Sequence, residues 1–308
     1  MVAFHYSRQF RTAPVLRYPG GKADVVGLLR HYRPEGVKEL REPFVGGGSF
    51  FFEVGFTCAR AWLNDMHDGL MAVYAALRDR PEEFIAKCRA IAPAQPDDRM
   101  TGRGVRGGAP KNARLKAIFD QLKLDESADQ ALRYFFINRT NFGSGRVNYD
   151  IPSRQCFGSS AGWTIAAIDR LEQAASALQG VRLTCGDYLP LFEEPGDDVL
   201  IFADPPYVVN SRLSASSQLY QHSFTEGDHY AFAEAVRNCR HKVMVTYDED
   251  EHGLVRSLFP AEDYLVEELG WRYAGSTLGE KKLGRELLIC NYEPPCVAWR
   301  YGESCAAP

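Results

Sequence analysis

Four consecutive residues, Asp204-Pro205-Pro206-Tyr207, form the most distinctive chemical group in the sequence. They directly follow an apolar run, 199–203, which is typical of a buried strand. The two prolines restrict the backbone and remove two amide donors, so the Asp204 carboxylate and the Pro205 carbonyl are both left as hydrogen-bond acceptors. Tyr207 adds a flat aromatic face beside them. Two acceptors next to a stacking ring can bind a planar amino group, such as that of adenine. We favour this interpretation of the segment over that of a simple rigid turn.

A glycine-rich segment, Glu42-Pro43-Phe44-Val45-Gly46-Gly47-Gly48-Ser49, lies between a predicted strand and a helical stretch. Glycines at such a turn let the backbone approach a ligand closely, although a plain structural turn has the same composition. No Gly-Lys-Ser/Thr follows, so the segment is not a Walker loop. Asp65 lies roughly 20 residues after Gly46, a spacing at which a carboxylate often bonds ribose hydroxyls. Together these features favour a nucleoside cofactor, and they fit a dinucleotide and S-adenosylmethionine equally well.

Alternating strand and helix patterns must position these groups. Apolar and β-branched runs predict strands at 38–44, 61–64, 181–185, 199–203, 242–246, 264–268 and 286–291. Helical periodicity predicts helices at 69–77, 165–178 and 228–240. The alternation predicts an α/β fold whose sheet carries helices on both faces, with ligands at the carboxyl ends of the strands. The mostly helical block 86–180 interrupts the alternation and predicts an inserted subdomain, with a Pro- and Gly-rich loop at 91–112.

Composition excludes several classes of protein. The chain has 308 residues, of which 45% are hydrophobic and 25% charged, which excludes wholesale disorder. It has no apolar run of about 18 residues, so no membrane span is expected. The N-terminus lacks an apolar signal core, so we expect a cytoplasmic protein. The eight cysteines form no C-x-x-C pair and the histidines are dispersed, so we expect no metal. A net charge of −4 argues against a protein that coats nucleic acid, although the segment 99–116 is locally basic.

The motifs, in this order, resemble the S-adenosylmethionine-dependent adenine-specific DNA methyltransferases of the Dam family, in their alpha group. Tyr18-Pro19-Gly20-Gly21-Lys22 is similar to the N-terminal cofactor motif of that family, and Cys185-Gly186-Asp187-Tyr188 to its Cys-x-Asp-aromatic signature. The segment 135–142, followed by Arg146-Val147-Asn148, resembles the Asn-Arg segment of the family's target-recognition insert. The segment 284–289 is like its C-terminal strand. Phe142-Gly143-Ser144-Gly145 departs from the usual Asn-Gly-Leu, and the family's Pro-Phe-Gly is only loosely represented. These departures concern the recognised base sequence rather than the methylation chemistry.

The resemblance implies a Rossmann-like methyltransferase sheet formed by 1–85 and 181–300, a target-recognition subdomain at 86–180, and a tail at 301–308. It implies methyl transfer from S-adenosylmethionine to the exocyclic 6-amino group of a flipped-out adenine in double-stranded DNA. The implied catalytic residues are Asp204, Pro205, Pro206 and Tyr207. The implied cofactor residues are Tyr18, Lys22, Phe44, Gly46, Gly48, Asp65, Asp187, Tyr188 and Asp204. The DNA-binding candidates are Arg139, Asn141, Arg146 and Asn148.

Several alternatives stay open at this point. The same chemistry fits the 4-amino group of cytosine or adenine in RNA, because Asp-Pro-Pro-Tyr suits any exocyclic amine. A nucleic-acid-binding protein without catalysis is an alternative of another class. Each DNA-binding candidate fits a phosphate contact as well as a base contact. We expect a monomer, and a cognate restriction endonuclease, as in restriction-modification systems, is compatible with the sequence but not required.

Overall fold

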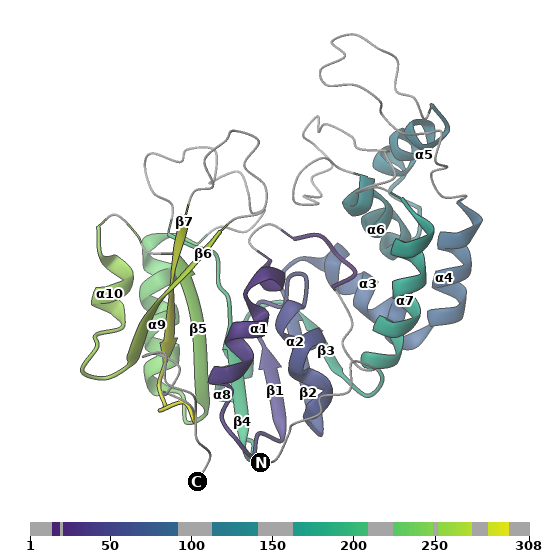
Figure 1. Ribbon diagram of the computed structural model, residues 1–308. Helices are drawn as coiled ribbons and strands as arrows, with labels where there is room; N and C mark the ends of the chain where they lie inside the picture. The colour runs from purple at the N-terminus through teal and green to yellow at the C-terminus, as the bar shows by residue number, and fades with distance from the viewer. Residues whose placement is uncertain are drawn as a thin grey trace.

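A seven-stranded mixed sheet forms the centre of the computed structural model, in the order β3-β2-β1-β4-β5-β7-β6 (Figure 1). The structure describes residues 14–18, 21–91, 113–140, 163–208, 224–248, 250, 252–272 and 283–295. The strands are β1 (Glu39–Glu42), β2 (Arg60–Asp65), β3 (Arg182–Cys185), β4 (Val199–Ala203), β5 (Lys242–Asp248), β6 (Leu265–Arg272) and β7 (Leu283–Cys290). Within the group β1 to β5, neighbouring strands are parallel. Strand β7 runs antiparallel to both β5 and β6. Each predicted strand overlaps one of these.

Helices connect the strands and cover the sheet. Those in the first half are η2 (Lys22–Asp24), α1 (Val26–Leu29), η3 (Arg30–Tyr32), α2 (Ser49–Val54), η4 (Gly55–Thr57), α3 (Asp68–Asp79), α4 (Pro81–Ala90), α5 (Ala113–Leu124) and α6 (Gln130–Thr140). Those in the second half are α7 (Ile165–Ala177), α8 (Leu189–Glu193), α9 (Glu226–Asn238) and α10 (Leu254–Leu258). Within the described part of the chain, no helix is long and apolar enough to cross a membrane.

Strand β4 shows why both faces of the sheet are covered. Successive side chains of a strand point to opposite faces. Leu200 and Phe202 pack into a cluster with α1, α2 and α3, whereas Val199, Ile201 and Ala203 pack into a second cluster with α8, α9 and α10. This confirms the predicted α/β sheet with helices on both faces.

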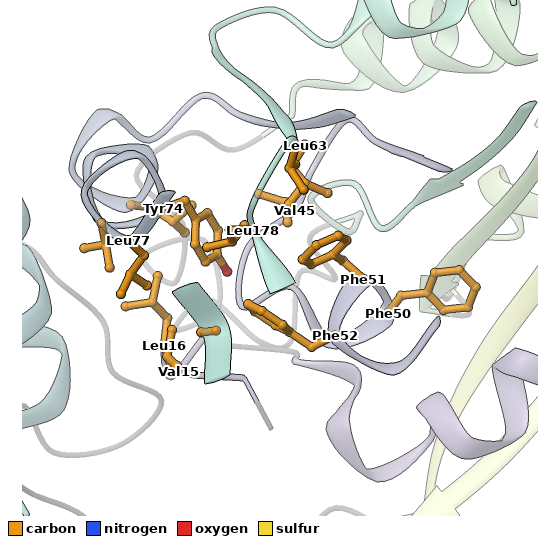
Figure 2. Packing of buried hydrophobic residues seen from close by; sticks show 14 of the residues in the cluster. Val15, Leu16, Val45, Phe50, Phe51, Phe52, Leu63, Tyr74, Leu77 and Leu178 are labelled. Atoms are coloured by element: carbon orange, nitrogen blue, oxygen red, sulfur yellow. The ribbon is translucent and has the colours of Figure 1, made fainter. Parts of the chain in front are cut away.

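The first cluster fixes helix α2 against the sheet, as Figure 2 shows for Phe50, Phe51 and Phe52. The ring of Phe50 stacks on that of Phe202 in β4, with centroids 4.3 Å apart. Phe52 packs at 6.3 Å from Tyr74 of α3. Because three successive aromatic residues are buried, the glycine segment that leads into α2 is held over the carboxyl ends of the strands.

Helices α4 to α7 lie between β2 and β3 in the sequence and gather beside α3 in Figure 1. Helix α6 packs on α3, and α7 packs on α4 and α3. Trp163, just before α7, joins the group through Phe135 and Phe136 of α6, at centroid distances of 5.4 and 4.8 Å. The predicted start of the inserted subdomain, at residue 86, falls inside α4. A target-recognition subdomain with the limits 86–180 stays a prediction, and the tail 301–308 lies outside the described residues.

Candidate active site

A cavity of about 460 Å³ opens at the carboxyl ends of the parallel strands. Its walls come from the segments that follow β1, β2, β3 and β4, together with the N-terminal segment around Lys22. This is the edge at which open α/β sheets bind ligands. Every residue predicted to bind the cofactor lines this one cavity: Tyr18, Lys22, Phe44, Gly46, Gly48, Asp65, Asp187, Tyr188 and Asp204. Strand order and loop length thus bring together motifs that lie far apart in the sequence.

Asp65 holds the glycine segment in place. Its Oδ2 accepts a hydrogen bond from the backbone N–H of Gly46 at 2.9 Å, and its Oδ1 accepts one from that of His67 at 3.0 Å. Gly46 has a φ of +47°, and a Cβ there would lie 2.9 Å from the Tyr18 ring. Gly48 also has a positive φ, of +69°. Only glycine allows both the positive φ and the close approach of Tyr18 at position 46. At this point the cavity wall is therefore formed by backbone without a side chain.

Asp204 is surrounded by donors. Its Oδ2 lies 2.8 Å from Lys22 Nζ, and its Oδ1 accepts hydrogen bonds from the Tyr207 hydroxyl and from Thr246 Oγ1, both at 2.8 Å. Lys22, which is 4% exposed, also donates to the Tyr207 hydroxyl. Pro205 and Pro206 line the cavity beside Asp204, whereas Tyr207 is not among its lining residues. The Asp-Pro-Pro-Tyr segment is therefore fixed by contacts from η2 and β5 as well as by its own prolines.

Two further carboxyl groups lie on the strands behind Lys22. Glu286 Oε1 in β7 is 3.6 Å from Lys22 Nζ, and Glu286 lies directly opposite Asp248 of β5 in the antiparallel register. The pKa of Glu286 is raised to about 8, mainly by burial and in part by the charges of Asp204 and Asp248, while Lys22 opposes the shift. Burial likewise raises the pKa of Asp248. Sequence reasoning missed Glu286, although an acid within an apolar strand was a visible signal.

Glu42, at the end of β1, is a cavity residue that sequence reasoning passed over. It is 2% exposed, and its Oε1 has no hydrogen-bond partner in the described structure. Burial raises the pKa of Glu42 well above its ordinary value, opposed by a hydrogen bond from the Phe51 backbone, and the charge of Asp204 raises it further. A buried carboxyl group with a vacant acceptor oxygen suits a cationic group in the cavity.

Aromatic rings form one wall of the cavity. Phe44 lies 5.2 Å from Tyr188 and 5.8 Å from Phe224 between ring centroids, and all three residues line the cavity. Asp187, next to Tyr188, accepts a hydrogen bond from the backbone N–H of Leu189 at 2.7 Å, which fixes its carboxylate at the start of α8. Flat apolar rings beside a fixed carboxylate suit the base and amine of a nucleoside.

The predicted DNA-binding residues are only partly described. Arg139 lies in the last turn of α6 and is 8% exposed. Asn141, Arg146 and Asn148 lie outside the described residues, as does most of the basic segment 99–116. Among the residues that the structure describes, no group of His, Cys, Asp and Glu side chains has the arrangement of a metal site.

Comparisons with known proteins place the chain in a family. Residues 18–269 match the family model of the D12 class N6 adenine-specific DNA methyltransferases. A Type II methyltransferase of Lactococcus lactis subsp. cremoris, M1.LlaDCHI, is 23% identical over 289 residues, covering 91% of this chain and 95% of that protein. A DNA adenine methylase of Vibrio cholerae serotype O1 is 28% identical over 228 residues, covering 71% of this chain and 74% of that protein. The DNA N-6-adenine-methyltransferase of Escherichia phage P1 is 26% identical over 272 residues, covering 87% of this chain and 34% of that protein.

Proposed function

Because the chain belongs to the family of D12 class N6 adenine-specific DNA methyltransferases, we propose that its cavity binds S-adenosylmethionine and that Asp204 holds the 6-amino group of a flipped-out adenine. Membership makes the chain an adenine-specific DNA methyltransferase that uses a methyl donor. One observation carries the finer proposal: Asp204 lies on the wall of a cavity that all the predicted cofactor residues share. Family membership, rather than this geometry, favours adenine in DNA over cytosine and over RNA.

The residues of the cavity fit this cofactor. The aromatic wall of Phe44, Tyr188 and Phe224 suits the adenine ring, and Asp65 suits the ribose hydroxyls. The vacant oxygen of Glu42 suits the ammonium group of the methionine part. Lys22 supplies a cation close to Asp204. When bound, S-adenosylmethionine supplies an electrophilic methyl group, and these residues orient it.

Asp204 and Pro205 act on the target base. In free adenine, the lone pair of the exocyclic nitrogen is delocalised into the ring, which makes it a poor nucleophile. Hydrogen bonds from its two N–H groups to the Asp204 carboxylate and the Pro205 carbonyl draw the nitrogen toward tetrahedral geometry. The carboxylate also stabilises the positive charge that develops there. Flipping the base costs a few kcal/mol, and stacking on Tyr207 recovers about 1–3 kcal/mol.

The contacts of Asp204 prepare it for this role. A carboxylate has about four lone-pair sites, and Lys22, Tyr207 and Thr246 already donate to Asp204. One site then remains for the amino group of the base. The carboxylate is therefore oriented before the base arrives, which lowers the reorganisation needed in the transition state.

Mass-spectrometric nucleoside analysis tests the function directly. Unmethylated genomic DNA is incubated with the purified protein and S-adenosylmethionine, and we expect 6-methyladenine in the digest. The appearance of 4-methylcytosine would leave the mechanism standing and show that the target base is wrong. Cofactor binding without any methylated base in DNA or RNA would favour a binding protein without catalysis. A monomeric state, a cytoplasmic location and a cognate endonuclease stay predictions.

Replacing Thr246 with valine is expected to lower the rate of methyl transfer about 10- to 100-fold, since one hydrogen bond to a charged group contributes about 1.5–3 kcal/mol. Thr246 is fully buried and does not line the cavity, so cofactor affinity should stay unchanged. Single-turnover methylation of an oligonucleotide measures the rate. The matched control is Thr246→Ser, which keeps the hydroxyl donor and should retain most activity. Equal loss in both variants would argue for packing rather than for positioning of Asp204.

Cofactor binding is expected to release protons through Glu42. Burial holds the pKa of Glu42 well above its ordinary value, so the free protein keeps this group protonated where an exposed glutamate is ionised. The ammonium group of the cofactor favours the ionised form, so the pKa falls on binding. Affinity should therefore rise with pH up to the pKa of the free protein and level off above it. Calorimetry in buffers of different ionisation enthalpy counts the protons, and Glu42→Gln should abolish their release. Identical proton release in this variant would remove Glu42 from the proposal.

A further inference from the structure

Asn64, the residue before Asp65 at the end of β2, bridges two segments of the cavity wall. Its side chain is buried, with the residue 1% exposed. Its amide nitrogen donates one hydrogen bond to the Pro43 carbonyl at 3.0 Å and another to the Gly186 carbonyl at 2.9 Å. Pro43 follows β1 and Gly186 follows β3, and these strands flank β2 in the sheet (Figure 1). One side chain therefore joins two loops that both line the cavity.

A series of hydrogen bonds that begins at Trp62 fixes the orientation of this amide. The indole N–H of Trp62 donates to Thr184 Oγ1 at 2.8 Å, and the Thr184 hydroxyl donates to Asn64 Oδ1 at 2.8 Å. An indole nitrogen can only donate, so the hydroxyl has to direct its own hydrogen to Asn64. The amide oxygen is thus held beside Thr184, and both amide N–H groups point at the two carbonyls. A flipped amide would place oxygen against oxygen in a buried site, which is costly.

The Asn64 amide is occupied by contacts within the protein. Both of its N–H groups donate and its oxygen accepts, and neither Asn64 nor Thr184 is among the described residues that line the cavity. The backbone adds to the same connection, because the Asn64 carbonyl accepts a hydrogen bond from the Val45 N–H at 2.8 Å. Asn64 therefore acts on the cavity through the loops that it joins.

The two loops carry the aromatic wall of the cavity. Phe44 directly follows Pro43, Tyr188 comes shortly after Gly186, and the two rings lie 5.2 Å apart between centroids. Gly186 has no side chain that could anchor its loop, so backbone hydrogen bonds hold it. Its N–H donates to the Asp65 carbonyl at 3.1 Å, and its own carbonyl accepts from Asn64. The spacing of the two rings therefore depends on the Asn64 amide.

We propose that Asn64, oriented by Thr184 and Trp62, is a positioning residue that sets the affinity for S-adenosylmethionine by fixing the two aromatic loops. The inference rests on the proposed function, which places the adenine ring of the cofactor against these loops. Asp204 is held separately, by Lys22 of η2 and Thr246 of β5. The rate of methyl transfer at saturating cofactor should therefore be independent of Asn64, while cofactor affinity depends on it.

Replacing Asn64 with aspartate tests this role. The two side chains have the same shape, but the carboxylate directs an oxygen at carbonyls to which the amide donates. We expect the Kd and KM for S-adenosylmethionine to rise about 10- to 100-fold, while kcat at saturating cofactor stays within about twofold. The added negative charge alone would favour this cofactor, whose net charge is positive, so weaker binding reports the positions of the loops. Calorimetric titration and steady-state kinetics measure both effects.

Asn291→Asp is the matched control. The Asn291 side chain also connects two backbone groups: it accepts from the Val243 N–H at 2.7 Å and donates to the His241 carbonyl at 2.9 Å. These contacts lie at the amino end of β5, whereas the cavity lies at the carboxyl ends of the strands. Both variants should lower the melting temperature, and only Asn64→Asp should raise the KM for the cofactor. Equal cofactor affinities in the two folded variants would overturn the proposal.

Thr184 provides a second test, which also applies if Asn64→Asp does not fold. Thr184→Val removes the donor to the amide oxygen and should raise the Kd for S-adenosylmethionine about 10-fold. Thr184→Ser keeps the hydroxyl and should bind the cofactor like the unaltered protein. Equal affinities in the valine and serine variants would reject the role of Asn64. Failure of the unaltered protein to bind S-adenosylmethionine would instead refute the proposed function, so the two failures are distinguishable.

Discussion

Alanine in place of Asp204 should abolish methyl transfer to DNA while the protein still folds and binds its cofactor. The substitution removes the acceptor for the adenine amine and the charge that stabilises the developing cation. Removing one such preorganised group typically lowers kcat about 10²- to 10³-fold, and loss of alignment adds to this. Methyl transfer from radiolabelled cofactor into an oligonucleotide measures the rate. Near-normal turnover would contradict the mechanism.

The fold should survive this change because Lys22 keeps other partners. Its Nζ still contacts the Tyr207 hydroxyl and lies 3.6 Å from Glu286. The charge of Asp204 raises the pKa of Glu286, so removing it lets Glu286 ionise more readily and pair with Lys22. The control is Asp204→Asn, which keeps one acceptor oxygen but not the charge. We expect the rate of methyl transfer of Asp204→Asn to lie between those of Asp204→Ala and the unaltered protein, since the geometry of the acceptor and its charge both contribute to catalysis.

Alanine in place of Asp65 should weaken cofactor binding about 100-fold. Two charge-assisted hydrogen bonds fix the turn at Gly46 and the backbone of His67, and each contributes about 1.5–3 kcal/mol. The same carboxylate is the proposed partner of the ribose hydroxyls. Calorimetric titration of the folded variant with S-adenosylmethionine measures the change.

Asp68 provides a matched control for Asp65. It lies at the start of α3, and its side chain is 76% exposed and bonds the Gly69 backbone and Gln130. Asp68→Ala removes a nearby carboxylate without touching the glycine turn, so it should leave cofactor affinity unchanged. If Asp65→Ala folds and binds the cofactor as tightly as Asp68→Ala, the proposed role of Asp65 is wrong.

Local sequence predicted the elements best where a boundary signal was present. The run 199–203 matches β4 residue for residue because Asp204-Pro205 ends it. Helix α9 begins at Glu226, earlier than predicted from Asp228, because Thr225 and Asp228 form a capping box. Strand β6 extends to Arg272, beyond the predicted 268, since its pairing with β7 continues there. Long-range pairing, rather than local pattern, sets such limits.

The candidate site could likewise be predicted where local motifs were present, and not where it depends on long-range contacts. Most motif residues next to predicted strand ends line the cavity, although Tyr207 and Cys185 do not, because parallel strands bring their carboxyl ends to one edge. Thr246 and Glu286 were missed because only the structure shows that they contact Asp204 and Lys22, which are distant in the sequence. Glu42 lay inside a recognised motif, yet only the structure shows that its carboxyl group is buried with a vacant acceptor.

The position of β7 also bears on when the enzyme becomes active during synthesis. This strand lies between β5 and β6, although it follows both in the chain. It also carries Glu286 to Lys22, so that residues from near the two ends of the described chain meet beside Asp204. Translation proceeds from the N-terminus, so the sheet stays divided beside β5 until β7 leaves the ribosome. We therefore expect a nascent chain to complete the surroundings of Asp204 only after β7 has left the ribosome.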